Sequence, residues 1–271
     1  MRARAVTLGL AFLALGCGDA LPSPAVVDAP RVLALTTATP DVRPGSEVTV
    51  RALWFDPSNR DVAFRWRLCR EVSGFDPRAC AVPSVGRDLD ATTERVTLPP
   101  SALSLDASER EGTWVLWLLA CPGSTASVRD GRYQCALNDG VEVFRRVGVR
   151  REGALNTPPS ITSITLDGRA LTDGATLPLP RCDGACAPLT VSVTPREDAV
   201  ETAPDGVAEA LLLSVYVTGG SVSPVRDAAA RGERRVMSVR WTPPSEGEVR
   251  AWIALRDQRG GESVVSVRFV R

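Results

Sequence analysis

Apolar and polar residues alternate along several short stretches of the chain, which is the pattern of a strand with one buried face. In residues 62–68, Val62, Phe64 and Trp66 alternate with small or charged residues. The same period of two recurs in the segments 48–54, 189–193, 249–255 and 265–269. The alternation therefore predicts half-buried strands spread over most of the chain.

One further stretch, residues 211–218, is apolar on both faces, and its β-branched Val215 and Val217 favour a central strand over a buried helical turn. The 21 Pro and 22 Gly are typical of short strands joined by many turns. The predicted fold class is therefore all-β. A chain of 271 residues is long enough for two domains of about 100 to 130 residues each.

Two stretches without an apolar face divide the chain. Residues 17–30 carry Pro every few positions and predict an extended spacer, and residues 151–159 predict a linker. The predicted domains are therefore residues 31–150 and 160–271. Both contain a Pro-Pro pair after one strand and a Glu-Gly pair before a later one, at 99–100 with 111–112 and at 243–244 with 246–247. This order predicts a divergent duplication, for which chance similarity of two sandwiches is the alternative.

A late strand of the second body runs into Leu255-Arg256-Asp257-Gln258-Arg259-Gly260-Gly261. This turn resembles the one that often joins the last two strands of Ig-like or PKD-like domains of bacterial surface proteins. The resemblance implies two tandem Ig-like β-sandwich domains. The first body has Cys121-Pro122-Gly123 in place of the Asp-Gly-Gly turn, and neither body has the antibody-type pattern of core Cys around Trp.

Residues 1–16 have the three parts of an export signal: Arg2 and Arg4, an apolar run from Val6 to Leu15, and small residues before a cut. Ten apolar residues are too few to span a bilayer, which takes about 20 in a helix. The sequence Leu-Ala-Leu-Gly-Cys ending at Cys17 resembles the lipobox of bacterial lipoproteins, with Ala14 where that family usually has Leu.

The lipobox resemblance implies lipidation of Cys17 and attachment to a membrane through the N-terminal lipid. Gly18 after the Cys implies the outer membrane by similarity to the sorting pattern of enteric bacteria. An ordinary secretory peptide that is cut nearby is the alternative interpretation. The predicted localisation is the cell envelope.

Cysteine number agrees with an anchor, because lipidation of Cys17 would leave an even six of the seven cysteines. These six fall in neighbouring pairs: Cys69 with Cys80, Cys121 with Cys135, and Cys182 with Cys186. Structural disulfides are expected because an exported compartment is oxidising. A metal site or redox pair is the alternative, but Cys182 and Cys186 are spaced one residue too far apart for a thioredoxin-like motif, and no His is present as a ligand.

The chain contains no His, and all 32 of its basic residues are Arg. The usual Ser-His, Cys-His and Ser-Lys nucleophile pairs are therefore excluded, and the sequence predicts neither an enzyme nor a cofactor. Without the leader the chain has 30 basic and 32 acidic side chains, a net charge of −2, so no nucleic-acid partner is expected.

A few residues remain as candidates for chemistry or binding. Asp198 and Asp205 lie in the densest acidic stretch and, with Asp257, are candidate Ca²⁺ ligands or, for the first two, hydrolase carboxylates; a solvated loop is the plain alternative. Trp252 is the tryptophan that alternation places on an outer face, which makes it the candidate exposed contact residue. The basic run of Arg145, Arg146, Arg150 and Arg151 predicts a charged edge strand, with phosphate or sulfate binding as the alternative.

Taken together, the sequence predicts a non-enzymatic envelope lipoprotein that acts as a surface binding, adhesion or structural module, with an envelope protein or a glycan as partner. An accessory subunit of an envelope or secretion assembly is the first alternative. A carboxylate hydrolase is the second.

Overall fold

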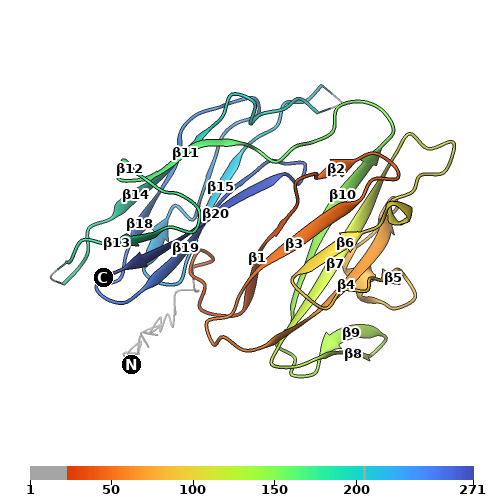
Figure 1. Cartoon of the computed structure of the whole chain (residues 1–271), viewed down its shortest axis with the longest axis horizontal. Helices are drawn as coiled ribbons and strands as arrows, with labels where there is room; N and C mark the ends of the chain where they lie inside the picture. The colour runs from red at the N-terminus through yellow and green to blue at the C-terminus, as the bar shows by residue number, and fades with distance from the viewer. Residues whose placement is uncertain (1–22, 183, 204–205) are drawn as a thin grey trace, which may run out of the picture.

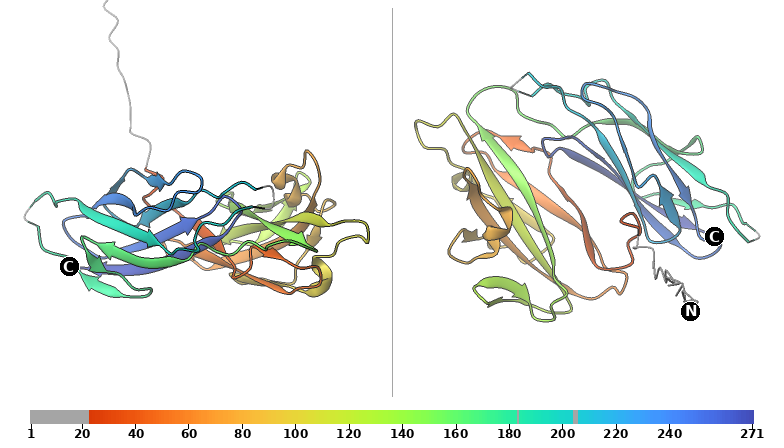
Figure 2. Two further views of the ribbon diagram at one scale, coloured as in Figure 1. Left: turned by 90° about the horizontal axis from the view of Figure 1, so that it is seen from above. Right: turned by 180° about the vertical axis from the view of Figure 1, so that it is seen from behind.

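The computed structural model describes residues 23–182, 184–203 and 206–271, and it is all-β apart from two short 3₁₀ helices, η1 (Pro77–Ala81) and η2 (Pro100–Ala102). Its strands form two halves that lie side by side (Figure 1), and both halves lie within one elongated, flat molecule (Figure 2). The predicted signal segment and Cys17 lie outside the described residues. Within the described ranges no helix has the length and apolar character that crossing a bilayer requires.

The first half is a sandwich of two sheets. One sheet has the order β1-β3-β6, and the other has the order β2-β10-β7-β4-β5. Their bounds are β1 (Arg31–Thr36), β2 (Asp41–Val42), β3 (Val48–Phe55), β4 (Val62–Glu71), β5 (Arg87–Asp88), β6 (Arg95–Leu98), β7 (Glu111–Pro122) and β10 (Val141–Arg150). Alternate residues of both sheets, such as Val50 and Trp66, meet in one buried core, as the period of two predicts.

The second half has the sheets β12-β11-β14-β18-β16 and β13-β20-β19-β15-β17. The bounds are β11 (Ile161–Leu166), β12 (Arg169–Ala170), β13 (Thr176–Pro178), β14 (Leu189–Pro195), β15 (Leu212–Val217), β16 (Ser221–Ser223), β17 (Arg226–Ala228), β18 (Met237–Thr242), β19 (Val249–Arg256) and β20 (Glu262–Val270). The segment predicted as a central strand is β15, which pairs with both β19 and β17. Its core joins residues of both sheets, among them Val193 and Ile253.

Eight strands of each half follow the same order, and the second half adds β12 and β16 at the two edges of one sheet. The series β1-β3-β6 corresponds to β11-β14-β18, and β2-β10-β7-β4-β5 corresponds to β13-β20-β19-β15-β17. A parallel strand pairing also occurs at the same place in each half, between β2 and β10 and between β13 and β20. The first Pro-Pro pair follows β6 and the second follows its counterpart β18, which is what the duplication hypothesis expects. The four strands β11-β14-β18-β16, facing a sheet that contains β15, β19 and β20, are ordered like the A, B, E and D strands of an immunoglobulin-type sandwich.

The central strand β7 is buried on both faces, which a two-layer sandwich does not explain. On its outer face, Val115, Trp117 and Leu119 lie in a second cluster together with Cys69, Cys80, Cys121 and Cys135. The segments that cover them are η1 and the hairpin of β8 (Ala126–Arg129) and β9 (Arg132–Cys135). The first half therefore has a third layer, made by two loop excursions that fold back over the larger sheet.

Candidate functional site: the junction between the sandwiches

The structure joins the six cysteines of the described chain as sequence neighbours: Cys69 with Cys80, Cys121 with Cys135, and Cys182 with Cys186. Cys69 and Cys121 lie within β4 and β7, and each is bonded to one of the two excursions of the third layer. Both bonds therefore fix a loop onto the sheet that precedes it, which gives the predicted disulfides a structural role.

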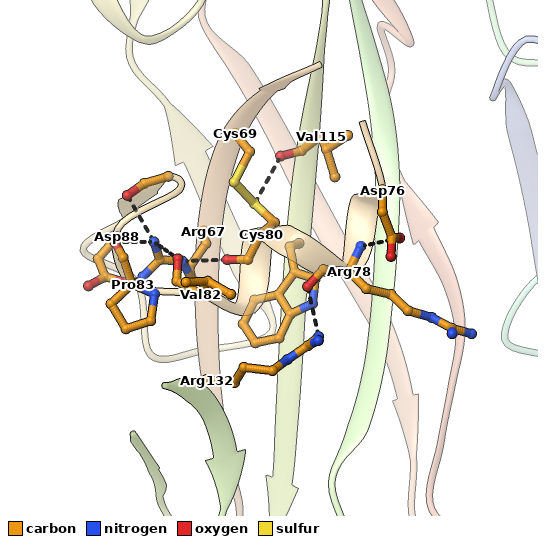
Figure 3. The surroundings of a disulfide bond; sticks show 12 residues. Arg67, Cys69, Asp76, Arg78, Cys80, Val82, Pro83, Asp88, Val115 and Arg132 are labelled. Atoms are coloured by element: carbon orange, nitrogen blue, oxygen red, sulfur yellow. Dashed lines mark hydrogen bonds and ion pairs between the residues drawn. A yellow bond between two sulfur atoms is a disulfide. The ribbon is translucent and has the colours of Figure 1, made fainter. Parts of the chain in front are cut away.

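Arg67 lies beneath the first excursion and is almost completely buried, at 1% exposed (Figure 3). Its guanidinium donates hydrogen bonds to the carbonyl oxygens of Cys80 at 2.8 Å and Gly86 at 2.8 Å, and it forms an ion pair with Asp88 at 2.7 Å. Two further carbonyls, of Val82 and Pro83, accept bonds from the same group. The buried guanidinium therefore satisfies four backbone carbonyls of the first excursion. The alternation of apolar and polar residues does not indicate this role.

The other large concentration of buried polar groups lies where the two halves meet. This junction brings together β1 and β10 of the first half with β15, β19 and the turn 257–261 of the second half. A cleft of about 570 Å³ lies along it, lined by residues of β1, β10 and that turn. The junction is therefore the best candidate for a functional site in the described chain.

The apolar part of the junction is built around Trp252, which lies on the outer face of the second sandwich. Its ring and that of Phe55 from β3 have centroids 4.9 Å apart, and Val27 and Leu33 are buried in the same cluster. Trp252 is only 4% exposed. The prediction that Trp252 is an exposed contact residue is therefore wrong, because the first half covers the outer face on which alternation correctly placed it.

The segment predicted as an extended spacer is partly packed. Ala25 is 2% exposed within the core of the second sandwich, and Val27 is 1% exposed at the junction. Val26 pairs in parallel with Val217, and the flanking backbone bonds, from Val27 to Val217 and from Val217 to Ala25, are both 2.8 Å. The physical reason is that residues 25–27 are apolar and β15 offers an open edge beyond the end of β17.

This packing predicts a large effect for Ala25→Asp, because a carboxylate would be placed in the core of the second sandwich without a partner. We expect the free energy of unfolding to fall by several kcal/mol, since an uncompensated buried charge carries a cost of this order. Hydrogen exchange should speed up in β15 and β19, far along the chain. The matched control is Ala29→Asp at an exposed position, and equal effects of the two variants would contradict this packing.

Three arginines form the polar part of the junction. Arg145 on β10 is 7% exposed and donates to the carbonyl oxygens of Leu35 on β1 and, at 2.5 Å, of Gly260 in the second half. Among the described residues no carboxylate forms an ion pair with it, and burial lowers the pKa of Arg145. Arg256 on β19 donates to the carbonyl of Leu33 at 2.9 Å and forms an ion pair with Glu262. Side chains thereby occupy the outer edge of β1, which otherwise would be open for pairing.

Arg259 is the third, at the tip of the turn between β19 and β20. It forms ion pairs with Asp41 of the first half at 3.0 Å and with Glu209 and Glu201 of the second half at 3.1 and 3.5 Å. Asp257 shapes the turn by accepting the backbone N–H groups of Arg259 and Gly261, both at 2.7 Å. Arg259 is thus paired both across the junction and within its own half, and Arg145 and Arg256 are hydrogen-bonded to backbone carbonyls across it. This arrangement suits holding two bodies together.

Two junction carboxylates give a pH dependence. Burial raises the pKa of Glu262, against the opposing charges of Arg256 and Arg145, and burial followed by the charge of Asp257 raises the pKa of Glu209. A carboxyl with a raised folded-state pKa contributes stability that is complete below its unfolded pKa of about 4.3 and is lost as pH rises through the folded value.

We therefore expect the free energy of unfolding to decrease as pH rises from about 4.3 toward neutrality, and to decrease less in the variant Glu209→Gln/Glu262→Gln. Urea titrations at a series of pH values measure this slope. Carboxylates with lowered pKa, such as Asp227 beside Arg235, act in the opposite direction but below this range. Glu152→Gln at an exposed position is the control, and identical slopes in all three proteins would refute the assignment.

The acidic candidates are separate from this junction or belong to its turn. Asp198 forms an ion pair with Arg196 and accepts a hydrogen bond from Ser160, and that bond and the arginine lower its pKa. A lowered pKa does not suit a general acid. Asp257 is occupied by the turn and by Asn156, and Asp205 lies outside the described residues. In the described ranges no three Asp, Glu or Cys side chains are grouped to hold a metal ion.

The predicted basic run is distributed over structural contacts. Arg146 pairs with Glu71 at 2.8 Å, Arg150 pairs with Glu111 at 2.5 Å, and Arg151 donates to the carbonyl of Glu109 at 2.9 Å. These pairs lie on the surface of one half, whereas Arg145 turns into the junction. The sequence could have indicated the burial of Arg145, because Arg145 lies between Val143 and Val147, which face inward on β10.

No family model matches the chain, and no curated protein matches it. Similar solved structures include the D00-D0 domain of intimin, at 12% identity over 90% of this chain and 99% of that chain with a TM-score of 0.25. The Yersinia pseudotuberculosis adhesin InvE is 13% identical over 87% of this chain and 58% of its own, with a TM-score of 0.24. The Salmonella enterica SafA pilin in complex with the SafB chaperone is 12% identical over 90% of this chain and 97% of its own, with a TM-score of 0.28. Identities and TM-scores this low establish no relationship between these proteins and the chain.

Proposed function

We propose that this chain is an exported lipoprotein whose two sandwiches act as one stiff structural or adhesive module of the cell envelope. The observation that carries the proposal is the junction, where Trp252 packs on Phe55 and Arg259 pairs with Asp41. Domains that share a buried apolar and ionic contact keep a fixed mutual orientation, whereas independent domains move.

The disulfides support the exported part of the proposal. Three bonded pairs hold surface loops in the described chain, and such bonds persist in oxidising compartments outside the cytoplasm. The lipid anchor at Cys17 rests on the leader sequence, and outer-membrane placement rests on Gly18.

The anchor is tested by the intact mass of the protein extracted from membranes. We expect a chain that begins at Cys17, carries acyl groups and contains three disulfides. A chain that still begins at Met1, or that partitions wholly into water with an unmodified sulfur at position 17, would refute it.

The module is tested by binding. We expect the wild-type protein to retain an isolated envelope polysaccharide, and the junction variant Trp252→Ala to retain it more weakly, because the two bodies then move independently. Crosslinking on intact cells gives the competing outcome: one protein recovered at fixed stoichiometry, without polysaccharide binding, would assign the chain to an assembly as an accessory subunit.

A further inference from the structure

Residues 23–27 are held at one defined place on the molecule. Ser23 leads directly into residues 25–27, which are fixed along the end of β15 by the pairing of Val26 with Val217. Arg31 adds a hydrogen bond from its guanidinium to the carbonyl of Pro24 at 2.6 Å. The residues that precede the first sandwich are therefore attached to the second one (Figure 1).

This attachment shortens any tether that starts at Cys17. Fourteen residue steps separate Cys17 from the first strand at Arg31, but only six separate it from Ser23. An extended chain spans at most about 3.3 to 3.6 Å per residue, so the reach falls from about 50 Å to about 20 Å. A reach of about 20 Å is close to the length of β18 itself, six residues at about 3.3 Å each.

The strand register identifies the loops at this end. In the second half Val217 leads into the loop 218–220, and its partner strand β19 begins after the turn 243–248. In the first half Arg31 pairs with Phe55, which leads into the loop 56–61. The guanidinium of Arg250 lies 5.7 Å from the ring centroid of Phe55, so the loop ends of the two halves lie side by side.

We infer that the end of the molecule formed by the loops 56–61, 218–220 and 243–248 faces the membrane, with lipid head groups as its partner. The opposite loops, 43–47 and 229–236, then point away from the bilayer. This inference rests on the proposed lipid anchor and adds an orientation to it. The short tether, attached at one end of both sandwiches, holds that end close to the lipid.

The test compares labels at the two ends of one strand. Ser58→Cys and Glu47→Cys flank β3, and Glu246→Cys and Arg231→Cys flank β18; all four positions are exposed. In the acylated protein the introduced thiol is the free one, because Cys17 is modified and the other six cysteines are bonded. Each variant carries a fluorophore and is reconstituted into phosphatidylcholine vesicles that contain a head-group quencher.

We expect quenching at positions 58 and 246 to be at least about twofold greater than at positions 47 and 231, since strands of this length separate the ends by about 20 Å or more. The matched control inserts twelve Gly and Ser residues after Gly18, which lengthens the tether without touching the fold, and should bring the four values together. Equal quenching at both ends without the insertion, or stronger quenching at 47 and 231, would overturn the inference.

Failure of the anchor is recognised separately. If the intact mass shows no acyl group, the proposed lipidation fails and the membrane-facing orientation fails with it. The geometric step, that a short tether ahead of Ser23 holds this end of the molecule close to lipid, is tested separately with Cys17→Ser preceded by a hexahistidine on nickel-chelating lipid. The same twofold difference would support this step, and equal quenching would refute it.

Discussion

Replacing Arg67 with Met should lower the free energy of unfolding by about 3 kcal/mol or more, because each hydrogen bond to a charged group contributes about 1.5 to 3 kcal/mol and the buried guanidinium of Arg67 donates several. The carbonyls of Cys80, Val82, Pro83 and Gly86 lose their common donor in this variant. The carbonyl of Cys80 is buried and contributes most of this loss, because water cannot replace its donor. The ion pair with Asp88 contributes little, since the Asp88 side chain is 46% exposed.

Urea unfolding with the disulfides intact measures this loss. The control is Arg87→Met on the neighbouring β5, an exposed position for which a change within about 0.5 kcal/mol is expected. Hydrogen exchange should show the opening confined to the first excursion, residues 75–88. A loss below about 1 kcal/mol would show that the disulfide between Cys69 and Cys80 holds the excursion without the arginine.

The second large effect is expected at the junction. Trp252→Ala removes a buried indole and should lower stability by about 3 to 5 kcal/mol, as large-to-small changes of buried aromatic residues do. It also deletes the partner of Phe55 and uncovers Val27 and Leu33. We therefore expect separate unfolding transitions for the two halves in place of a shared one.

Small-angle X-ray scattering checks the same variant at the level of shape, because loosened halves should give a larger radius of gyration. Leu137→Ala is the control, since Leu137 is 62% exposed and its truncation leaves no cavity. An unchanged radius and a single transition in Trp252→Ala would mean that the arginines alone hold the junction.

The strands were the part of the structure most open to prediction from the sequence. In the segment 249–255, Val249, Ala251 and Ile253 face the core, as their period of two requires. The all-β class follows from such segments. Alternation also places Trp252 on the correct face of its sheet, but it does not predict that the side chain is buried. The pattern shows which side of a sheet a residue occupies and says nothing about what packs there.

The junction was not predicted because its partners are far apart in sequence. Arg259 and Asp41 are separated by 218 positions, and Arg256 and Leu33 by 223. Local pattern gives no information on such pairs. The packing of Ala25 onto the second sandwich was missed for a different reason: the Pro residues around it gave a composition typical of a spacer, while the three apolar residues 25–27 were too few to show a period.

The sheets that contain β7 and β19 correspond to each other, but different parts of the chain cover their outer faces. On β7 the face of Trp117 is covered by loops of the same half, and on β19 the face of Trp252 is covered by the neighbouring half and by residues 25–27. The first sandwich thus covers the outer face of β7 with its own loops, whereas the outer face of β19 is covered only when the rest of the chain is present. A gene fragment encoding only residues 160–271 would yield a sticky, aggregation-prone product with a bare indole. If the chain arose by duplication, the second sandwich, which has no covering loops on this face, would depend on the first sandwich to keep Trp252 buried.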